Sequence, residues 1–142
     1  RHYPEADKSI SDNAANVKRL IMVSGKFYYD IVEERDKRGL KNVAIIRIEQ
    51  LAPFPWDRVA QECKRYKDAE VYWVQEEPKN MGAWSFAQPR ISHATRGINN
   101  DEKRPRYVGR KPSAATATGL GTRAHNAETA EILEEAFDGL DK

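Results

Sequence analysis

Apolar residues follow two alternating patterns along the chain, short continuous runs and helical spacing. Runs rich in Val, Ile and aromatic residues are typical of buried strands and cover residues 17–24, 42–51, 69–75 and 106–109. After each run, apolar residues at spacings of three and four predict helices over residues 26–39, 56–66, 83–96 and 124–140. Because strands and helices alternate, we expect an α/β fold with a mostly parallel sheet.

The first 16 residues differ from the rest because they are polar and show neither a continuous apolar run nor the helical spacing of apolar residues. We interpret residues 1–16 as a linker or strap from a preceding domain, and residues 17–142 as the domain itself. The first residue is Arg rather than Met, so we also expect the chain to be part of a longer protein.

Composition excludes several classes of function. The chain has 142 residues with 39% hydrophobic and 32% charged residues, enough for one ordinary globular domain. No apolar run approaches the roughly 20 residues of a membrane span, and the net charge of +2 gives no argument for a nucleic-acid partner. One cysteine and three scattered histidines do not form a metal-binding pattern, so no metal site is expected in this chain.

The loop after the third predicted strand, "EEPKNMGAW", reads either as a catalytic loop or as a strand-to-helix connector. Adjacent carboxylates in extended chain point to opposite sides, so they are poor partners for acid–base chemistry. Proline ends a strand, asparagine caps a helix, glycine permits a tight turn and tryptophan supplies apolar area. We therefore favour a connector without catalytic residues, made of Glu76, Glu77, Pro78, Asn80, Gly82 and Trp84.

Three basic residues are candidates for binding an anionic effector. Lys26 stands at a predicted helix start, where backbone N–H groups are free to meet an anion, although a plain turn is the simpler interpretation. Arg47 interrupts an apolar strand, so it needs an anion or a carboxylate, and Glu49 lies two residues on along the same side. Arg110 follows the fourth strand in a basic stretch, for which a solvated charged face is the alternative.

Several long strings in this order resemble one family. "VAIIRIEQLAPFPWD", "VYWVQEEPKNMGAWSFAQPRI" and "RYVGRKPSAATATG" closely resemble the C-terminal domain of thiamine-diphosphate-dependent 2-oxoglutarate dehydrogenases, over nearly the whole chain. The related 2-oxoadipate dehydrogenases have a similar domain. The resemblance implies a transketolase-like C-terminal domain, in which helices cover both faces of a mostly parallel sheet.

The resemblance also implies a role for the full-length enzyme. Family members are oxidoreductases of the tricarboxylic acid cycle that decarboxylate 2-oxoglutarate with thiamine diphosphate and Mg²⁺. They pass a succinyl group to the lipoyl arm of the succinyltransferase component. The cofactor lies between two other domains of a homodimer, so this chain alone is not expected to bind it or to be active. Some members bind a nucleotide effector such as acetyl-coenzyme A, and AMP is a further candidate.

We therefore expect an assembly and regulatory domain that contacts the catalytic domains and a second copy of the same enzyme. Two alternatives stay open. One is a stand-alone, non-catalytic interaction subunit that retains this fold, and the other is the equivalent domain of a 2-oxoadipate dehydrogenase. The resemblance implies the mitochondrial matrix for a eukaryotic source and the cytoplasm for a bacterial one.

Overall fold

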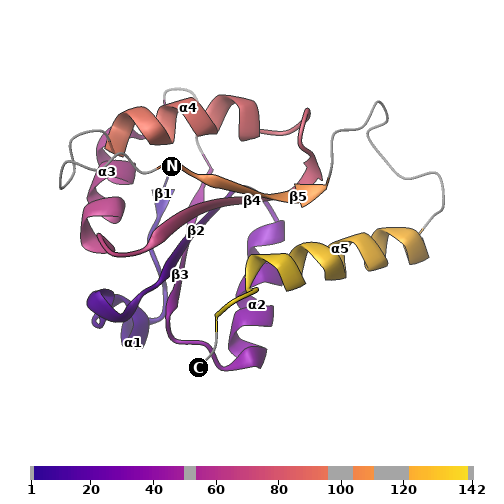
Figure 1. The fold of residues 1–142 in the computed structure, drawn as a ribbon, viewed down its shortest axis with the longest axis horizontal. Coiled ribbons are helices and arrows are strands. Elements are labelled where there is room, and N and C mark those ends of the chain that lie inside the picture. Colours follow the sequence, from indigo (N-terminus) through magenta and orange to yellow (C-terminus); the bar gives the residue numbers. More distant parts are fainter. Residues whose placement is uncertain (1, 50–53, 96–103, 111–121, 141–142) are drawn as a thin grey trace.

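The computed structural model describes residues 2–49, 54–95, 104–110 and 122–140 (Figure 1). Strands and helices alternate after a short N-terminal segment. The elements are β1 His2–Tyr3, α1 Lys8–Ser11, the 3₁₀ turn η1 Ala14–Asn16, β2 Arg19–Val23, α2 Phe27–Arg38, β3 Val43–Ile48, α3 Trp56–Arg65, β4 Glu70–Pro78, α4 Trp84–Thr95, β5 Arg106–Arg110 and α5 Thr122–Ala136.

The strands form one sheet in the order β1-β3-β2-β4-β5. β2 to β5 are parallel to their neighbours, whereas the two residues of β1 pair antiparallel with the end of β3. The predicted α/β fold with a mostly parallel sheet is therefore confirmed. Element bounds shift by a few residues, and the last two residues of the predicted strand 42–51 lie outside the described residues.

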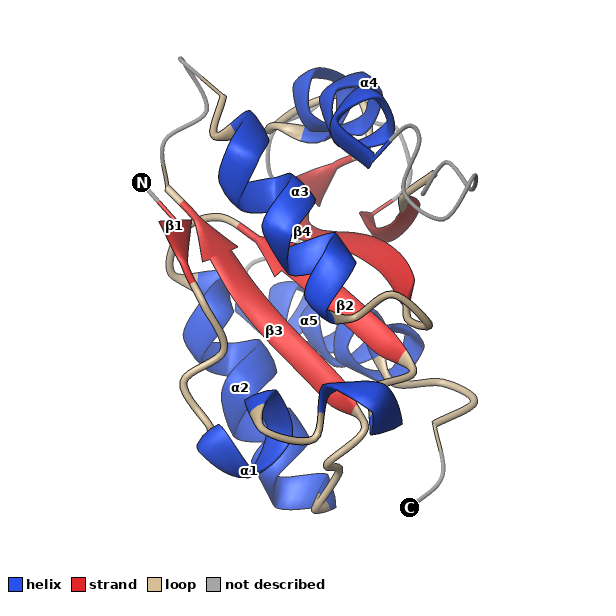
Figure 2. Ribbon diagram, turned by 90° about the vertical axis from the view of Figure 1, so that its left-hand side faces the viewer, coloured by secondary structure: helices blue, strands red, loops and turns tan. Residues whose placement is uncertain are grey.

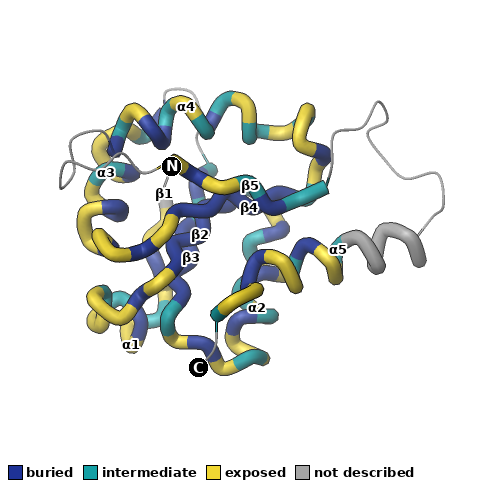
Figure 3. The backbone as a smooth tube through the Cα atoms, viewed as in Figure 1, coloured by how far each residue is buried: buried dark blue, intermediate teal, exposed yellow. Residues whose placement is uncertain are grey.

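Helices cover both faces of the sheet (Figure 2). α3 and α4 pack on one face around Met22 and Trp73, while α2 and α5 pack on the other around Ile21 and Val74. Because successive strand residues face opposite cores, the strands are buried on both sides, which Figure 3 shows as a dark central sheet. This burial explains why the strands read as continuous apolar runs in the sequence.

The chain reverses its direction across the sheet between β2 and β4. α2 leads from β2 to β3 on one side, whereas α4 leads from β4 to β5 on the other side. Because the two connections diverge, a crevice opens between the carboxyl ends of β2 and β4. Ligands of open α/β sheets bind at such a point.

Residues 2–16 pack against the β3 side of the sheet. Ile10 is fully buried, and the Glu5 side chain forms a buried ion pair with Arg35 of α2. Glu5 also accepts hydrogen bonds from the backbone N–H groups of Ile45 (2.7 Å) and Asp7 (2.8 Å). The segment is therefore tied to both β3 and α2, while the domain boundary at residue 16 stays a prediction.

Candidate functional site

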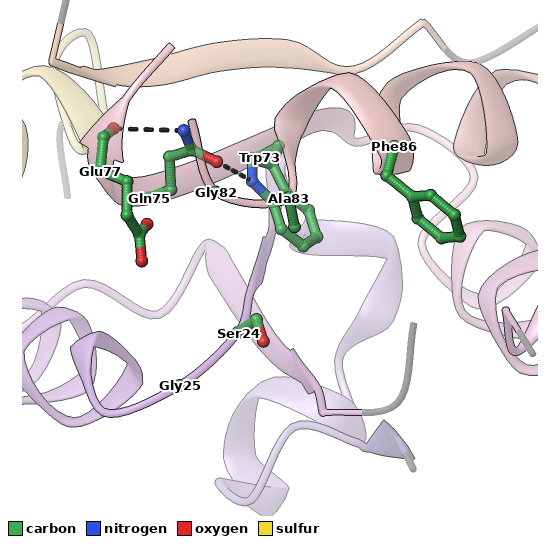
Figure 4. A pocket seen from close by; sticks show the side chains of 8 residues that line it. All are labelled: Ser24, Gly25, Trp73, Gln75, Glu77, Gly82, Ala83 and Phe86. Carbon is green, nitrogen blue, oxygen red and sulfur yellow. Dashed lines mark hydrogen bonds between the residues drawn. The ribbon is translucent and has the colours of Figure 1, made fainter. Parts of the chain in front are cut away.

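A pocket of about 460 Å³ lies at this crevice (Figure 4). Ser24 and Gly25, which follow β2, form one side, and residues of β4 and the start of α4 form the other. The lining residues are Ser24, Gly25, Trp73, Gln75, Glu77, Gly82, Ala83 and Phe86. Among the described residues, the lining is thus mostly apolar, and one of these side chains, that of Glu77, is charged.

Gln75 organises the wall of the pocket that β4 and its loop form. Its side-chain oxygen accepts hydrogen bonds from the indole N–H of Trp73 (3.0 Å) and the backbone N–H of Trp84 (3.1 Å). Its amide nitrogen donates to the carbonyl oxygens of Glu77, Pro78 and Met81 at 2.9–3.1 Å. This buried side chain therefore closes the loop onto the strand and satisfies the first N–H of α4. Our sequence analysis missed Gln75, although a polar residue at the end of an apolar run was the available signal.

Gly82 lets the loop turn back along the pocket wall. Its φ of +67° lies in the left-handed region, where a side chain is strained. A Cβ there would lie 3.1 Å from the Glu77 carboxylate and 3.2 Å from the Gln75 side-chain oxygen. Glycine thus leaves room for both side chains.

The other predicted connector residues stand around this turn. Pro78 is the last residue of β4, beyond a shift in the register between β4 and β5. Asn80 is exposed in the turn, and Trp84 opens α4 with its ring centroid 5.3 Å from that of Tyr107. The predicted strand ended at Gln75, so β4 ends three residues later than expected.

The adjacent carboxylates Glu76 and Glu77 line different hollows. Glu77 faces the pocket between β2 and β4, whereas Glu76 lines a separate hollow with Glu33 of α2 and Leu133 of α5. The divergence follows from the alternation of side chains along an extended segment. The two carboxylates therefore do not form an acid–base pair.

Arg47 lies at the carboxyl end of β3 within a cluster of polar and aromatic side chains. Its Nε forms an ion pair with Glu49 (2.5 Å), the partner that the alternation indicated, and its Nη1 donates a hydrogen bond to the Tyr29 hydroxyl (3.1 Å). Its guanidinium lies 5.2–5.7 Å from the ring centroids of Tyr3, Tyr28 and Tyr29. Burial alone would raise the pKa of Glu49, but hydrogen bonds from Arg47 and the Gly25 N–H lower it below its usual value.

The three predicted effector residues occupy different strand ends. Lys26 is exposed at the N-cap of α2, next to the β3 end that carries Arg47. Arg110 ends β5, which is separated from β2 by β4. The structure therefore brings Lys26 and Arg47 to neighbouring strand ends and places Arg110 on the far edge strand. Anion binding by these residues stays a prediction.

The most exposed large apolar side chains of the described residues lie at the carboxyl ends of the strands, an end of the sheet that we call its carboxyl edge. Tyr3, Tyr29 and Trp56 are 41%, 59% and 40% exposed, and no other large apolar side chain in the described ranges is as exposed. Tyr3 pairs with Arg47 near the end of β3, Tyr29 lies in the first turn of α2, and Trp56 begins α3. All three therefore lie at the carboxyl ends of β2 and β3.

Within the described ranges, no group of three or more His, Cys, Asp or Glu side chains is placed to hold a metal ion. Among the helices of that part of the chain, none has the length and apolar character needed to cross a membrane.

Comparison with known proteins gives one consistent family. A family model described as 2-oxoglutarate dehydrogenase C-terminal matches residues 1–137. The chain is 48% identical over 128 residues to the mitochondrial 2-oxoglutarate dehydrogenase of Caenorhabditis briggsae, covering 89% of this chain and 12% of that protein. It is 46% identical over 132 residues to the 2-oxoglutarate dehydrogenase E1 component of Brucella abortus (strain S19), covering 92% of this chain and 13% of that protein.

Proposed function

Because the chain belongs to the family of 2-oxoglutarate dehydrogenase C-terminal domains, we propose that it is the assembly domain of such an E1 component. In the proposal, the carboxyl edge of the sheet docks onto the rest of a longer polypeptide and helps to build its homodimer. The chain spans 12% and 13% of the two relatives described above, so the remainder of such a protein is far larger than this domain.

The observation that carries this proposal is the exposure of Tyr3, Tyr29 and Trp56 at one edge of the sheet. Aromatic side chains are enriched in the buried centres of protein interfaces, because they bury a large area at low cost in conformational entropy. The pocket between β2 and β4 opens at the same carboxyl edge. An edge with both features suits a protein partner.

The proposed activity belongs to the whole polypeptide. It decarboxylates 2-oxoglutarate and transfers the succinyl group to the lipoyl arm of a second component, as the resemblance in the sequence implies. Thiamine diphosphate and Mg²⁺ are placed in the rest of the polypeptide, and no catalytic step is assigned to this chain. Regulation by a nucleotide effector at Lys26 and Arg47 is part of the same proposal.

Two measurements test the assembly role. The denatured mass of the native polypeptide is expected to be several times 16.3 kDa, and a mass near 16.3 kDa would contradict the proposal. Hydroxyl-radical footprinting then compares the longer protein with the 142-residue chain. Tyr29 and Trp56 are expected to be oxidised much more slowly in the longer protein, because that protein covers them. Leu140 serves as the reference because it follows the end of α5, which contacts Arg19 at the amino end of β2, away from the docking edge. Equal rates for Tyr29 and Trp56 in the two proteins would refute the docking edge.

A further inference from the structure

We propose that the pocket between β2 and β4 receives an arginine side chain from the rest of the polypeptide, with its guanidinium paired to Glu77. The inference rests on the proposed assembly role and adds to it the chemistry of a central anchor. Some polar groups of the pocket are already hydrogen-bonded within its wall, whereas one charged group of the described lining residues can still bind an occupant.

The polar groups of Gln75 are not available to an occupant. Both its oxygen and its nitrogen make hydrogen bonds within the wall, to Trp73, Trp84 and three carbonyl groups. Breaking that set would leave buried polar groups without partners, which is costly. The occupant must therefore find its polar partner elsewhere in the pocket.

Glu77 is the charged group that remains. Its side chain is exposed, and no residue in the described ranges donates a hydrogen bond to its carboxylate. Figure 4 shows this carboxylate on the side of Gly25, while the rings of Trp73 and Phe86 stand on the other side of the pocket. A carboxylate among described lining residues that are otherwise uncharged favours a cationic occupant.

Arginine matches this combination better than lysine does. Its guanidinium forms two parallel hydrogen bonds to one carboxylate, and its plane stacks on aromatic rings. Its apolar stem is suited to the walls formed by Ala83 and Phe86. Gly82 leaves this space open, because a Cβ there would lie against the Glu77 carboxylate.

The occupant is assigned to the same polypeptide for two reasons. The pocket opens at the edge that carries the exposed aromatic residues Tyr3, Tyr29 and Trp56, and the relatives are about eight times longer than the matched segment. Arginine is also among the residues most often found as anchors at the centres of interfaces. A free small molecule with a guanidinium group is the other source of this chemistry, and the experiment separates the two.

The test uses Nα-acetyl-argininamide as the probe in an NMR titration of the ¹⁵N-labelled 142-residue chain. Saturable shifts are expected at the amides of Gly25, Gly82 and Ala83 and at the indole N–H of Trp73. Nα-acetyl-citrullinamide, a neutral analogue of nearly the same shape, is expected to give none. Glu77→Gln is expected to weaken binding about fivefold or more, whereas the control Glu76→Gln, which alters the other hollow, keeps it.

Absence of saturable shifts, equal binding of the citrulline analogue, or unchanged binding by Glu77→Gln overturns the inference. The same titration on the longer protein identifies the source of the guanidinium. If a side chain of that protein fills the pocket, the probe no longer binds there. If the probe binds the longer protein as it binds the chain, the pocket is open to a free ligand and the docking assignment is wrong. Slow oxidation of Tyr29 and Trp56 together with such an open pocket would leave the assembly role intact while refuting the anchor.

Discussion

The ion pair between Glu5 and Arg35 offers a sharp test of how the N-terminal segment is held. The Arg35 side chain is 2% exposed and that of Glu5 is 1% exposed. Burial alone would lower the pKa of Arg35, but its hydrogen bond and charge interaction with Glu5 raise it above its usual value. Replacing Glu5 by Ala removes this compensation and also leaves the backbone N–H of Ile45 without its acceptor.

Removing one partner of a buried ion pair typically costs about 3–5 kcal/mol, because the other charge stays buried. Arg35 keeps two partners, the Asp36 carboxylate at 3.2 Å and the Val43 carbonyl at 3.2 Å. The expected loss for Glu5→Ala therefore lies near the lower end, at about 3 kcal/mol. That is a large fraction of the roughly 5–15 kcal/mol that stabilises an ordinary domain.

Urea unfolding followed by far-UV circular dichroism measures this loss as a change in the midpoint and slope of the transition. Glu33→Ala, on the exposed side of α2, is the control and is expected to stay within about 0.5 kcal/mol of the parent chain. Glu5→Leu combined with Arg35→Met removes both charges, so it is expected to be much more stable than Glu5→Ala. A loss below about 1 kcal/mol for Glu5→Ala, or no recovery in the double variant, would refute the reasoning.

The remaining predictions concern the pocket wall and one buried acid. Gly82→Ala is expected to cost about 2 kcal/mol, and Gly25→Ala, which meets nothing within 4 Å, only about 1 kcal/mol; equal losses in urea would contradict the steric argument. Gln75→Met is expected to cost at least about 3 kcal/mol because several buried groups lose their partners, whereas Gln88→Met, which loses one long hydrogen bond, stays within about 0.5 kcal/mol. Burial raises the pKa of Glu62 in the folded state, so the folded chain binds this proton more tightly than the unfolded chain does. The resulting stabilisation is complete at low pH and is lost as the pH rises through the folded-state pKa of Glu62. Glu62→Gln should therefore raise the melting temperature near pH 7 and give little change at about pH 4, and a lower melting temperature near pH 7 would count against this.

The four main strands and the four long helices were predictable because each buries a regular face. Val43 to Ile48 face two cores in turn, so the strand reads as one apolar run. Gly39 ends α2 in the left-handed conformation, which places the boundary within a residue of the prediction. Periodic burial is local information, and the sequence carries it directly.

The N-terminal segment shows where that information stops. Residues 2–16 have no apolar period, yet Ile10 and Glu5 attach them to the core and to Arg35. These contacts join positions that are far apart in the chain, and a single buried glutamate among polar residues resembles a solvated one. The role of Gln75 could not be predicted for the same reason, because its hydrogen bonds depend on the turn geometry around Gly82 and not on a repeating pattern in the sequence.

The candidate site depends on strand order, which local patterns do not specify. The chain runs β2, β3, β4, but the sheet runs β3, β2, β4. If β4 had added beside β3, Gln75 and Glu77 would have met the chain after β3, and Ser24 would have lain one strand away. Because β4 pairs with β2, the loop after β2 and the loop after β4 diverge and leave the pocket between them. The same order sends β5 and Arg110 away from Lys26 and Arg47, so the three anion-binding candidates, which charge and local position indicated one by one, lie at separate strand ends. Glu77 reads in the sequence as half of a carboxylate pair, but the fold turns it into the crevice while Glu76 lines another hollow, and it is the charged side chain among the described residues that line the crevice.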